Sequence, residues 1–135
     1  MAETFHLSVF TPERPVLEAD AVSIIAPGAL GYLGVLAHHA PLITPLVPGK
    51  LTVREPEGIV QTYAISGGFL EVSGNKATIL ADAIETSDGI DLERAERARQ
   101  RAQERLADLK ASIDVARAQI ALERARNRIK VARER

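Results

Sequence analysis

Glycine and proline stop abruptly part of the way along this chain of 135 residues. All nine glycines and all seven prolines lie before Ile90. Since these residues are the strongest breakers of helix, the sequence predicts turns before Ile90 and uninterrupted helix after it. Charge divides at the same place: residues 1–89 carry 4 Lys and Arg against 10 Asp and Glu, and residues 90–135 carry 13 against 8. We therefore predict two domains, spanning 1–86 and 87–135.

The second domain repeats itself. Residues 90–95 (Ile-Asp-Leu-Glu-Arg-Ala) return as 113–118 (Ile-Asp-Val-Ala-Arg-Ala), and residues 101–106 return at the same offset as 124–129. A repeat of this kind predicts two similar helices. With a turn near residues 107–112, they would form an antiparallel two-helix hairpin.

Each predicted helix has an arginine face and a small apolar face. Arginines seven and four positions apart stay within about 40° of one another on a helix. The arginine faces consist of Arg94, Arg101 and Arg105, and of Arg117, Arg124 and Arg128. The apolar faces consist of Ala95, Ala98, Ala102, Leu106 and Leu109, and of Val115, Ala118, Leu122, Ala125, Ile129 and Ala132. An antiparallel hairpin concentrates the arginines, which costs energy unless carboxylates or a bound anion intervene.

Arginine-rich amphipathic helices also occur where no ligand binds. Many are solvated faces with ion pairs four residues apart, such as Glu93 with Arg97. A free-standing module that binds nucleic acid or another anion through the hairpin is the alternative function. That alternative is weakened by the lack of interleaved aromatic residues and by the carboxylates that dilute the positive charge. These carboxylates are Glu93, Glu96, Glu104, Asp108, Asp114, Glu123 and Glu134.

The first domain reads as short strands separated by turns. Apolar alternation in residues 5–9 and β-branched runs in 16–26, 51–54 and 59–65 are followed by similar runs in 69–72 and 76–83. Turn residues separate them, including Ser66-Gly67-Gly68. We expect an antiparallel β-sandwich or flattened barrel of about eight to ten strands, and thus an α+β chain. Residues 86–89 form a linker, and Asp88 or Asp91 can cap the first helix.

The segment 27–49 holds the residues that most resemble a catalytic or phosphate-binding loop. Its glycines at 28, 31 and 34 lack the spacing and the Lys-Ser/Thr of a P-loop. His38 and His39 would point to opposite sides of an extended segment, so a structural or interface role is expected and no metal site. No serine lies in a nucleophile elbow, so a small hydrolase is disfavoured. We expect no catalytic residues and no required cofactor.

Two further absences bear on location. The chain has no cysteine, so disulfides are excluded. The first thirty residues do not read as a signal peptide, and no run approaches the ~20 apolar residues that cross a bilayer.

Three segments, in order, resemble those of a known family. Residues 31–42 (Gly-Tyr-Leu-Gly-Val-Leu-Ala-His-His-Ala-Pro-Leu), 67–72 (Gly-Gly-Phe-Leu-Glu-Val) and 90–95 resemble motifs of the epsilon subunit of bacterial and plastid F-type ATP synthases. The resemblance runs over essentially the whole chain. It implies a non-catalytic central-stalk subunit that couples the rotor to the c-ring in proton-driven ATP synthesis. It also implies a hairpin that restrains ATP hydrolysis by switching between bent and extended forms.

The resemblance further implies partners, a location and a ligand. The partners would be the gamma subunit, the c-ring and the catalytic alpha and beta head subunits, without nucleic acid. The location would be peripheral, on the cytoplasmic face of a bacterial plasma membrane, or the stromal face of the thylakoid in a plastid. ATP would be a regulatory ligand. Its contacts, carried over by position, would come from Ile90, Asp91, Arg94, Ala95, Arg101, Arg124 and Arg128. Asp114 and Arg117 match the same pattern as Asp91 and Arg94, so the pattern leaves open which copy binds.

Overall fold

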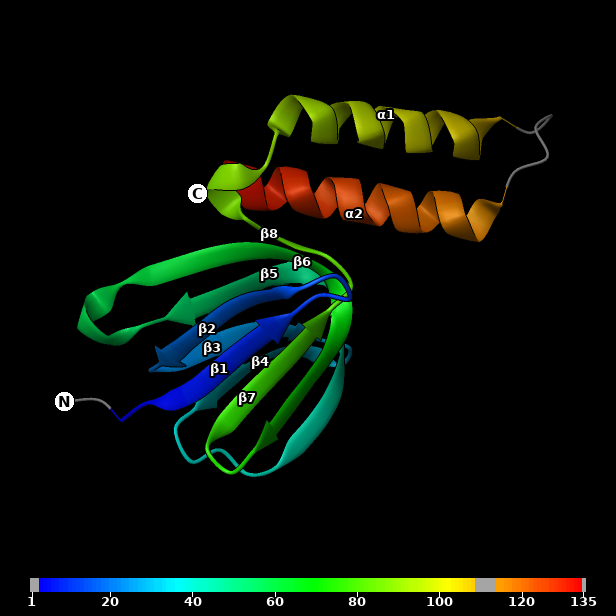
Figure 1. The fold of residues 1–135 in the computed structure, drawn as a ribbon. Helices are drawn as coiled ribbons and strands as arrows, with labels where there is room; N and C mark the ends of the chain where they lie inside the picture. The colour runs from blue at the N-terminus through cyan, green and yellow to red at the C-terminus, as the bar shows by residue number, and fades with distance from the viewer. Residues whose placement is uncertain (1–2, 109–113, 135) are drawn as a thin grey trace.

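The computed structural model describes residues 3–108 and 114–134, and within them a β-sandwich precedes two helices (Figure 1). The eight strands of this described part are β1 (Phe5–Phe10), β2 (Pro15–Ala21), β3 (Ser23–Gly28), β4 (Gly31–Leu36), β5 (Leu42–Arg54), β6 (Val60–Ser73), β7 (Lys76–Ala81) and β8 (Ile84–Thr86). The helices are α1 (Leu92–Ala107) and α2 (Val115–Arg133), and two 3₁₀ turns are η1 (Pro56–Gly58) and η2 (Ser87–Gly89). The predicted fold class is confirmed.

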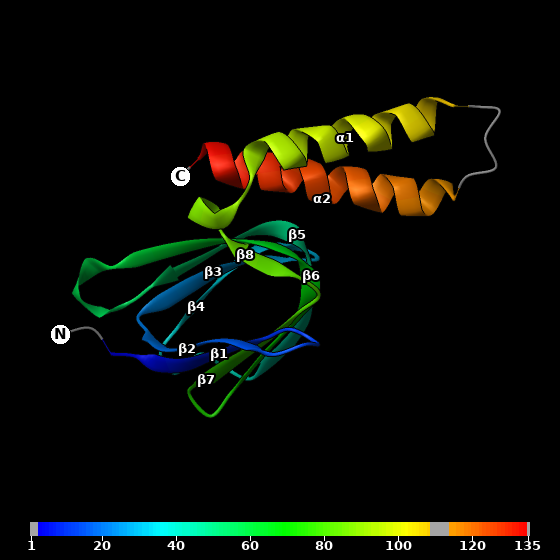
Figure 2. The same cartoon turned by 45° about the horizontal axis from the view of Figure 1, so that its top comes forward.

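The two longest strands hold the sandwich together. The strand order is β2-β1-β7-β6-β5-β3-β4, and β8 pairs with β6 outside this path. The second half of β6 pairs with β7, whereas residues 63–65 of its first half pair with β8. Because β5 and β6 curve as they run (Figure 2), each takes part in both layers. The pairing of β1 with β7 is parallel, which departs from the antiparallel pattern we predicted.

The core follows from strict alternation along the strands. In β1, Phe5, Leu7 and Val9 are buried and their neighbours are half-buried. Successive side chains of a strand point to opposite faces, so each strand contributes one apolar row to the space between the layers. The largest fully buried side chains of this core are Leu7, Ile24, Leu51, Ile65, Leu70 and Ile79.

The strands differ from the prediction at three places. The predicted run 16–26 is divided at Val22 into β2 and β3. Ser66-Gly67-Gly68 was expected to separate two strands, but β6 runs through it without a break. Gly67 (φ 112°) and Gly68 (φ 131°) adopt positive φ, which lets the strand bend while it keeps its partners. The segment 27–49, for which no strands were predicted, contains β4 and the first half of β5.

The hairpin closes through the predicted small apolar face. Asp91 caps α1 and Asp114 caps α2 in the same way, each accepting a hydrogen bond from the amide three residues later. The buried members of the seam are Ala95, Ala102, Ala118, Leu122, Ala125, Ile129 and Ala132. Val115 was predicted in the seam but is 51% exposed, because the described part of α1 leaves the first turn of α2 uncovered. Leu109 and most of the predicted turn lie outside the described residues.

The hairpin lies on the sandwich in its bent form. Figures 1 and 2 show α2 between α1 and the strands, and α2 contacts β5 and β6. A second apolar cluster, smaller than the sandwich core, joins the two parts through Ala64 of β6, Ile90, and Val131 and Ala132 of α2. Since these side chains bury little area, apolar packing holds the hairpin only modestly.

Candidate functional site

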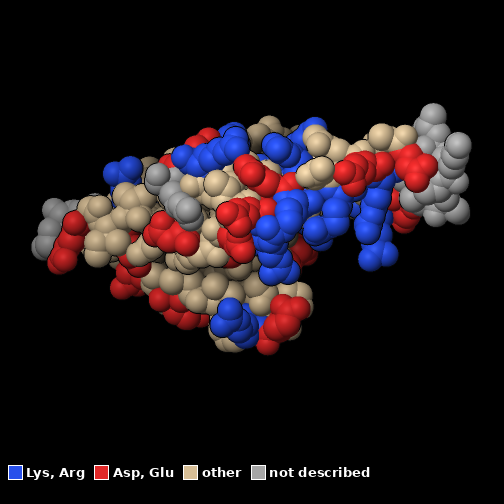
Figure 3. Space-filling model, turned by 90° about the horizontal axis from the view of Figure 1, so that it is seen from above, with Lys and Arg blue, Asp and Glu red and all other residues tan. Residues whose placement is uncertain are grey.

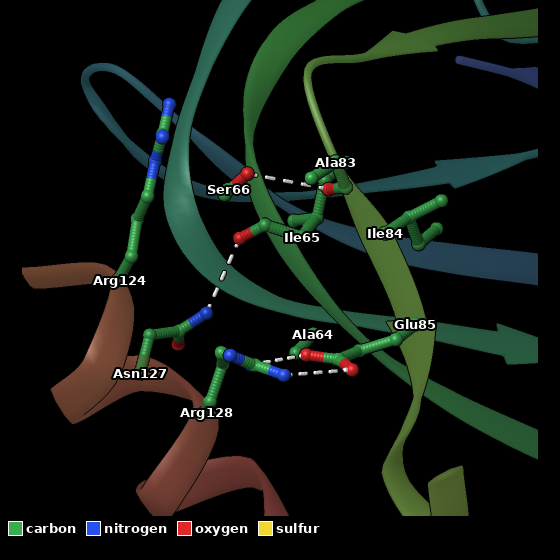
Figure 4. Close-up of a pocket in the computed structure, with 9 residues that line it drawn as sticks. All are labelled: Ala64, Ile65, Ser66, Ala83, Ile84, Glu85, Arg124, Asn127 and Arg128. Atoms are coloured by element: carbon green, nitrogen blue, oxygen red, sulfur yellow. Dashed lines mark hydrogen bonds and ion pairs between the residues drawn. The ribbon is translucent and has the colours of Figure 1, made fainter. Parts of the chain in front are cut away.

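A cavity of about 320 Å³ lies where α2 meets the sandwich (Figure 4). The sandwich contributes a wall from the paired strands β6 and β8 and the chain just before β8, and α2 contributes three polar side chains. The lining residues are Ala64, Ile65, Ser66, Ala83, Ile84, Glu85, Arg124, Asn127 and Arg128. Positions 124, 127 and 128 share one face of a helix, so all three side chains face the strands.

Asn127 ties α2 to the strands through its side-chain amide. Its Nδ2 donates hydrogen bonds to the carbonyl oxygens of Gly49 (2.9 Å) and Ile65 (3.2 Å). Packing within the sandwich requires the small residue at position 49, because a Cβ there would come within 2.4 Å of the Pro27 side chain and 2.7 Å of the Tyr32 oxygen. The amide thus links α2 to the backbone of two paired residues of β5 and β6.

Arg128 and Glu85 form a two-point ion pair across the same interface. Arg128 donates through Nε to Oε1 of Glu85 and through Nη2 to Oε2 at 3.1 Å. Both side chains are about 30% exposed (29% and 31%), so solvent screens the pair only in part. The pair neutralises one of the arginines in the basic face of α2.

Arg124 completes the lining of the cavity. It is exposed, and within the described residues its guanidinium makes no hydrogen bond or ion pair. Figure 4 shows its side chain extending along the mouth of the cavity, away from the Arg128–Glu85 pair. A free guanidinium offers a planar fork of donors suited to carboxylate or phosphate oxygens. The arrangement is therefore able to bind an anion at Arg124, with Arg128 available if Glu85 yields.

The other residues predicted to contact nucleotide lie elsewhere in the bent form. Ile90 is buried in the second apolar cluster, and Ala95 is buried in the seam between the helices. The Asp91 carboxylate caps α1 by accepting from the Arg94 amide at 3.1 Å. Arg94 and Arg101 have exposed side chains. The structure thus brings Arg124 and Arg128 into one cavity and does not bring the α1 residues to its lining.

Sequence reasoning missed Glu85 and Asn127. Asn127 breaks the repeat, since Glu104 occupies the equivalent place in the first copy, and this departure between two arginines was a usable signal. Glu85 had no such signal. Its partner is 43 residues away, and only the pairing of β8 with β6 sets the carboxylate beneath α2.

The histidines of the 31–42 motif take part in backbone structure. His38 adopts φ 63°, and its amide donates to Oδ1 of Asn75 at 2.8 Å. His39 places Nδ1 2.6 Å from the carbonyl oxygen of Ala40. In the described part of the chain, no group of three or more His, Asp or Glu side chains is arranged to hold a metal ion. No helix there is long and apolar enough to span a membrane.

The fold and the cavity define a class of protein, in which polar side chains hold a helical hairpin against a β-sandwich. Residues 4–87 match the family model described as the ATP synthase delta/epsilon chain, beta-sandwich domain. Residues 88–133 match the long alpha-helix domain of the same chain. The protein therefore belongs to the ATP synthase delta/epsilon chain family.

Individual relatives agree over nearly the whole length. The chain is 52% identical over 129 residues to the ATP synthase epsilon chain of Moorella thermoacetica, covering 96% of each chain. It is 48% identical to that of Desulforamulus reducens, covering 98% of this chain and 99% of the other. A chain in the mitochondrial ATP synthase of Euglena gracilis, solved with OSCP, F1 and the c-ring, superposes with a TM-score of 0.81 at 25% identity over 92% of this chain and 78% of the other. A chain of the Tetrahymena thermophila central stalk and c-ring shares the fold, with a TM-score of 0.64 at 15% identity over 98% and 96%.

Proposed function

We propose that this chain is the epsilon-type subunit of the central stalk of a rotary ATP synthase, without catalytic residues of its own. The observation that carries the proposal is the match of both domains, in order and over nearly the full length, to chains named ATP synthase epsilon chain. The family assignment leaves the alternative, a free-standing nucleic-acid-binding module, without support.

The sandwich has an outer surface suited to a rotor partner. Phe69 of β6 and Leu80 of β7 are direct cross-strand neighbours and are 54% and 56% exposed. Pro45 of β5 pairs with Phe69 on the other side, and Ile43, two residues along β5, is 72% exposed. Adjacent exposed apolar side chains of this size mark a surface that another protein covers. The gamma subunit and the c-ring are the partners we propose, at the cytoplasmic face of the plasma membrane of a bacterium or its plastid equivalent.

Substitution on this surface tests the coupling role. Phe69→Glu should prevent the chain from co-purifying with gamma and the c-ring, because it buries a charge in an apolar contact. Ile120→Glu alters an equally exposed apolar residue of α2, which is 49% exposed, and should leave assembly intact. Both variants are compared with the wild type by circular dichroism to confirm folding. Assembly of the Phe69 variant at wild-type yield would contradict the proposal.

We further propose that the hairpin regulates ATP hydrolysis by leaving the sandwich. The contacts that hold it are few and mostly polar: the Asn127 amide, the Arg128–Glu85 pair and the ion pair of Lys50 with Glu134 at 3.0 Å. Exposed or half-exposed ion pairs of this kind contribute about 1 kcal/mol or less each. A bent form held so weakly can exchange with an extended form that reaches the catalytic head.

ATP is the regulatory ligand that we propose for this equilibrium. Arg124 and Arg128 would receive its phosphates at the cavity, and the α1 residues Ile90, Asp91, Arg94, Ala95 and Arg101 remain predictions. A ligand shifts the equilibrium only by its differential affinity, RT ln(1 + [L]/Kd) when one form alone binds. At a hundredfold excess over Kd, that amounts to about 2.7 kcal/mol in favour of the bent form.

A distance measurement tests the switch. Labels replacing the exposed residues Glu57 of η1 and Glu104 of α1 report how far the hairpin lies from the sandwich. ATP should hold the two labels at the separation that the bent form sets, and lowering its concentration in the assembled complex should change that separation and increase the fraction of complexes that are inhibited. Arg124→Ala should weaken the response to ATP, whereas Arg97→Ala, which does not line the cavity, should preserve it. The mechanism would be contradicted if the label separation stayed the same at every ATP concentration while the inhibition of hydrolysis still changed with ATP.

A further inference from the structure

A second cavity, of about 290 Å³, opens on the hairpin and is lined mainly by basic side chains from both helices. Arg99 comes from α1, and Arg126, Lys130 and Arg133 come from α2. Positions 126, 130 and 133 recur every three to four residues, so they share one face of α2. The centre of that face lies about 150° around the helix from the centre of the face at the first cavity. Figure 3 shows basic side chains gathered in separate groups over the hairpin.

The charge of this second cavity is poorly compensated. Glu134 is the one carboxylate that lines it among the described residues, and its Oε2 is held by Lys50 at 3.0 Å. Arg133 donates from Nη2 to Glu96 at 2.7 Å. Within the described residues, Arg99, Arg126 and Lys130 have no acidic partner. Like charges gathered in a partly enclosed space repel one another, which opposes the approach of the two helices.

Arg99 supplies a second and independent observation. Its Nε is fully buried and has no hydrogen-bond acceptor, and it is the one such side-chain atom in the described part of the chain. Leaving a buried donor unpaired destabilises the folded chain, and more so when the group is charged. Buried polar atoms in native proteins are nearly always paired, so an orphan beside a solvent-accessible cavity indicates an acceptor that arrives from solution.

We infer that this cavity binds a compact multivalent oxyanion of the phosphate class, such as inorganic phosphate or pyrophosphate. Guanidinium groups donate two parallel hydrogen bonds to such oxygens, and Lys130 adds a point charge. At about 30 Å³ per water in the liquid, the cavity holds an anion of this size together with some of its water. The bound anion would accept from Arg99 of α1 and from Arg126 of α2, and would thereby join the two helices.

The site has a regulatory consequence that does not depend on the ATP proposal. An anion that needs both helices side by side binds the folded hairpin better than an extended one, so it stabilises the hairpin by linkage. The first cavity spans α2 and the sandwich, whereas this one spans α1 and α2. An anion bound in the second cavity therefore controls whether α1 and α2 pack against each other. It does not control whether the hairpin packs against the sandwich.

Side-chain NMR of the full chain tests the inference directly. Phosphate and pyrophosphate are titrated separately at constant ionic strength while the arginine Nε–H resonances are recorded. The Arg99 Nε–H resonance should shift with saturation and become protected from exchange with solvent. Arg99→Gln and Arg126→Gln should each weaken pyrophosphate binding roughly tenfold or more, since each removes a charge-assisted hydrogen bond.

Matched variants separate this site from diffuse attraction and from the first cavity. Arg97→Gln makes the same charge change two residues away, on a side chain that does not line the cavity, and should leave affinity within about twofold. Arg124→Gln removes the free guanidinium of the first cavity, and the shift of the Arg99 Nε–H resonance with pyrophosphate should persist in that variant. Equal weakening by Arg97→Gln, loss of the Arg99 shift in Arg124→Gln, or an Arg99 resonance that pyrophosphate does not move in the wild type would each overturn the inference. If Arg99→Gln disturbs folding, the response of the wild-type Arg99 Nε–H resonance to pyrophosphate is the deciding measurement.

Discussion

Individual side chains decide whether the hairpin rests on the sandwich, and the Arg128–Glu85 pair is the most directional of them. A two-point guanidinium–carboxylate contact fixes both position and angle, which a point contact such as Lys50–Glu134 does not. In the bent form, this pair also competes with any anion for Arg128. The residue that docks the helix is thus the one that a ligand at the first cavity would need to share.

A double-mutant cycle measures what that pair contributes. Glu85→Gln, Arg128→Gln and the double variant should show a coupling free energy of about 1 kcal/mol in unfolding of the full chain, because both groups are partly desolvated. Glu93 and Arg97 form an exposed pair at 4.0 Å within α1 and serve as the matched control. Their coupling should stay below about 0.5 kcal/mol. Equal coupling for the two pairs would show that burial adds nothing.

Tyr63 gives the sandwich a pH dependence at its alkaline limit. Burial of the phenol, with a smaller effect from the Glu55 charge, raises the pKa of Tyr63 above its ordinary value of 10.0. The unfolded chain then releases this proton at lower pH than the folded chain, so stability should fall as pH rises above about 10. Tyr63→Phe should flatten this decline in urea-unfolding curves measured from pH 9 to 11. An unchanged slope would contradict the assignment.

Among the elements, β6 depends on one backbone position. Gly68 has φ 131°, and a Cβ there would lie 1.9 Å from the carbonyl oxygen of Leu80 on β7. Gly68→Ala should therefore cost more than about 3 kcal/mol, since strain and a backbone clash add together. Gly34→Ala is the control, because its nearest new contact is 3.9 Å and its φ is ordinary. Thermal unfolding should separate the two variants by well over 5 °C.

The two helices begin with the same cap, and this equivalence can resolve which copy of the repeat serves a ligand. Asp91 and Asp114 accept from Arg94 and Arg117 amides at 3.1 and 3.0 Å. Asp91→Ala and Asp114→Ala should each destabilise the hairpin by about 1 kcal/mol through loss of the cap. Calorimetry with ATP then discriminates between them: we expect a further loss of affinity for Asp91→Ala alone. Matching affinities would assign the Asp91 carboxylate to capping only.

At the scale of the whole molecule, the sandwich is built to fold without its hairpin. Its core cluster contains no residue of α1 or α2, and Ala64 alone represents the strands in the second cluster. Truncation after Ser87 should leave a folded sandwich that binds gamma and supports ATP synthesis, while regulation of hydrolysis is lost. Strand content by circular dichroism and assembly with gamma provide the measurements. A truncated chain that fails to fold or assemble would contradict the assignment of assembly to the sandwich and of regulation to the hairpin.

The sequence by itself determined the two-part architecture, because local patterns carry that information. Alternation at Phe5, Leu7 and Val9 marks a strand with one buried face, and the absence of glycine and proline after Ile90 marks helix. The small apolar steps along both helices indicated the seam, and only its end at Val115 was wrong. The break expected at Gly67-Gly68 failed because the same residues that end strands also let a long strand bend.

Only the tertiary structure decided which polar groups meet. Glu85 lies beneath Arg128, and Asn127 reaches the carbonyls of Gly49 and Ile65, because strand pairing and helix docking bring distant segments together. The predicted ligand contacts separated for the same reason: Arg124 and Arg128 face the sandwich, whereas Arg94 and Arg101 are carried away on α1. Helical periodicity states which residues share a face, but the energy of docking, spread over contacts far apart in the chain, decides what that face meets.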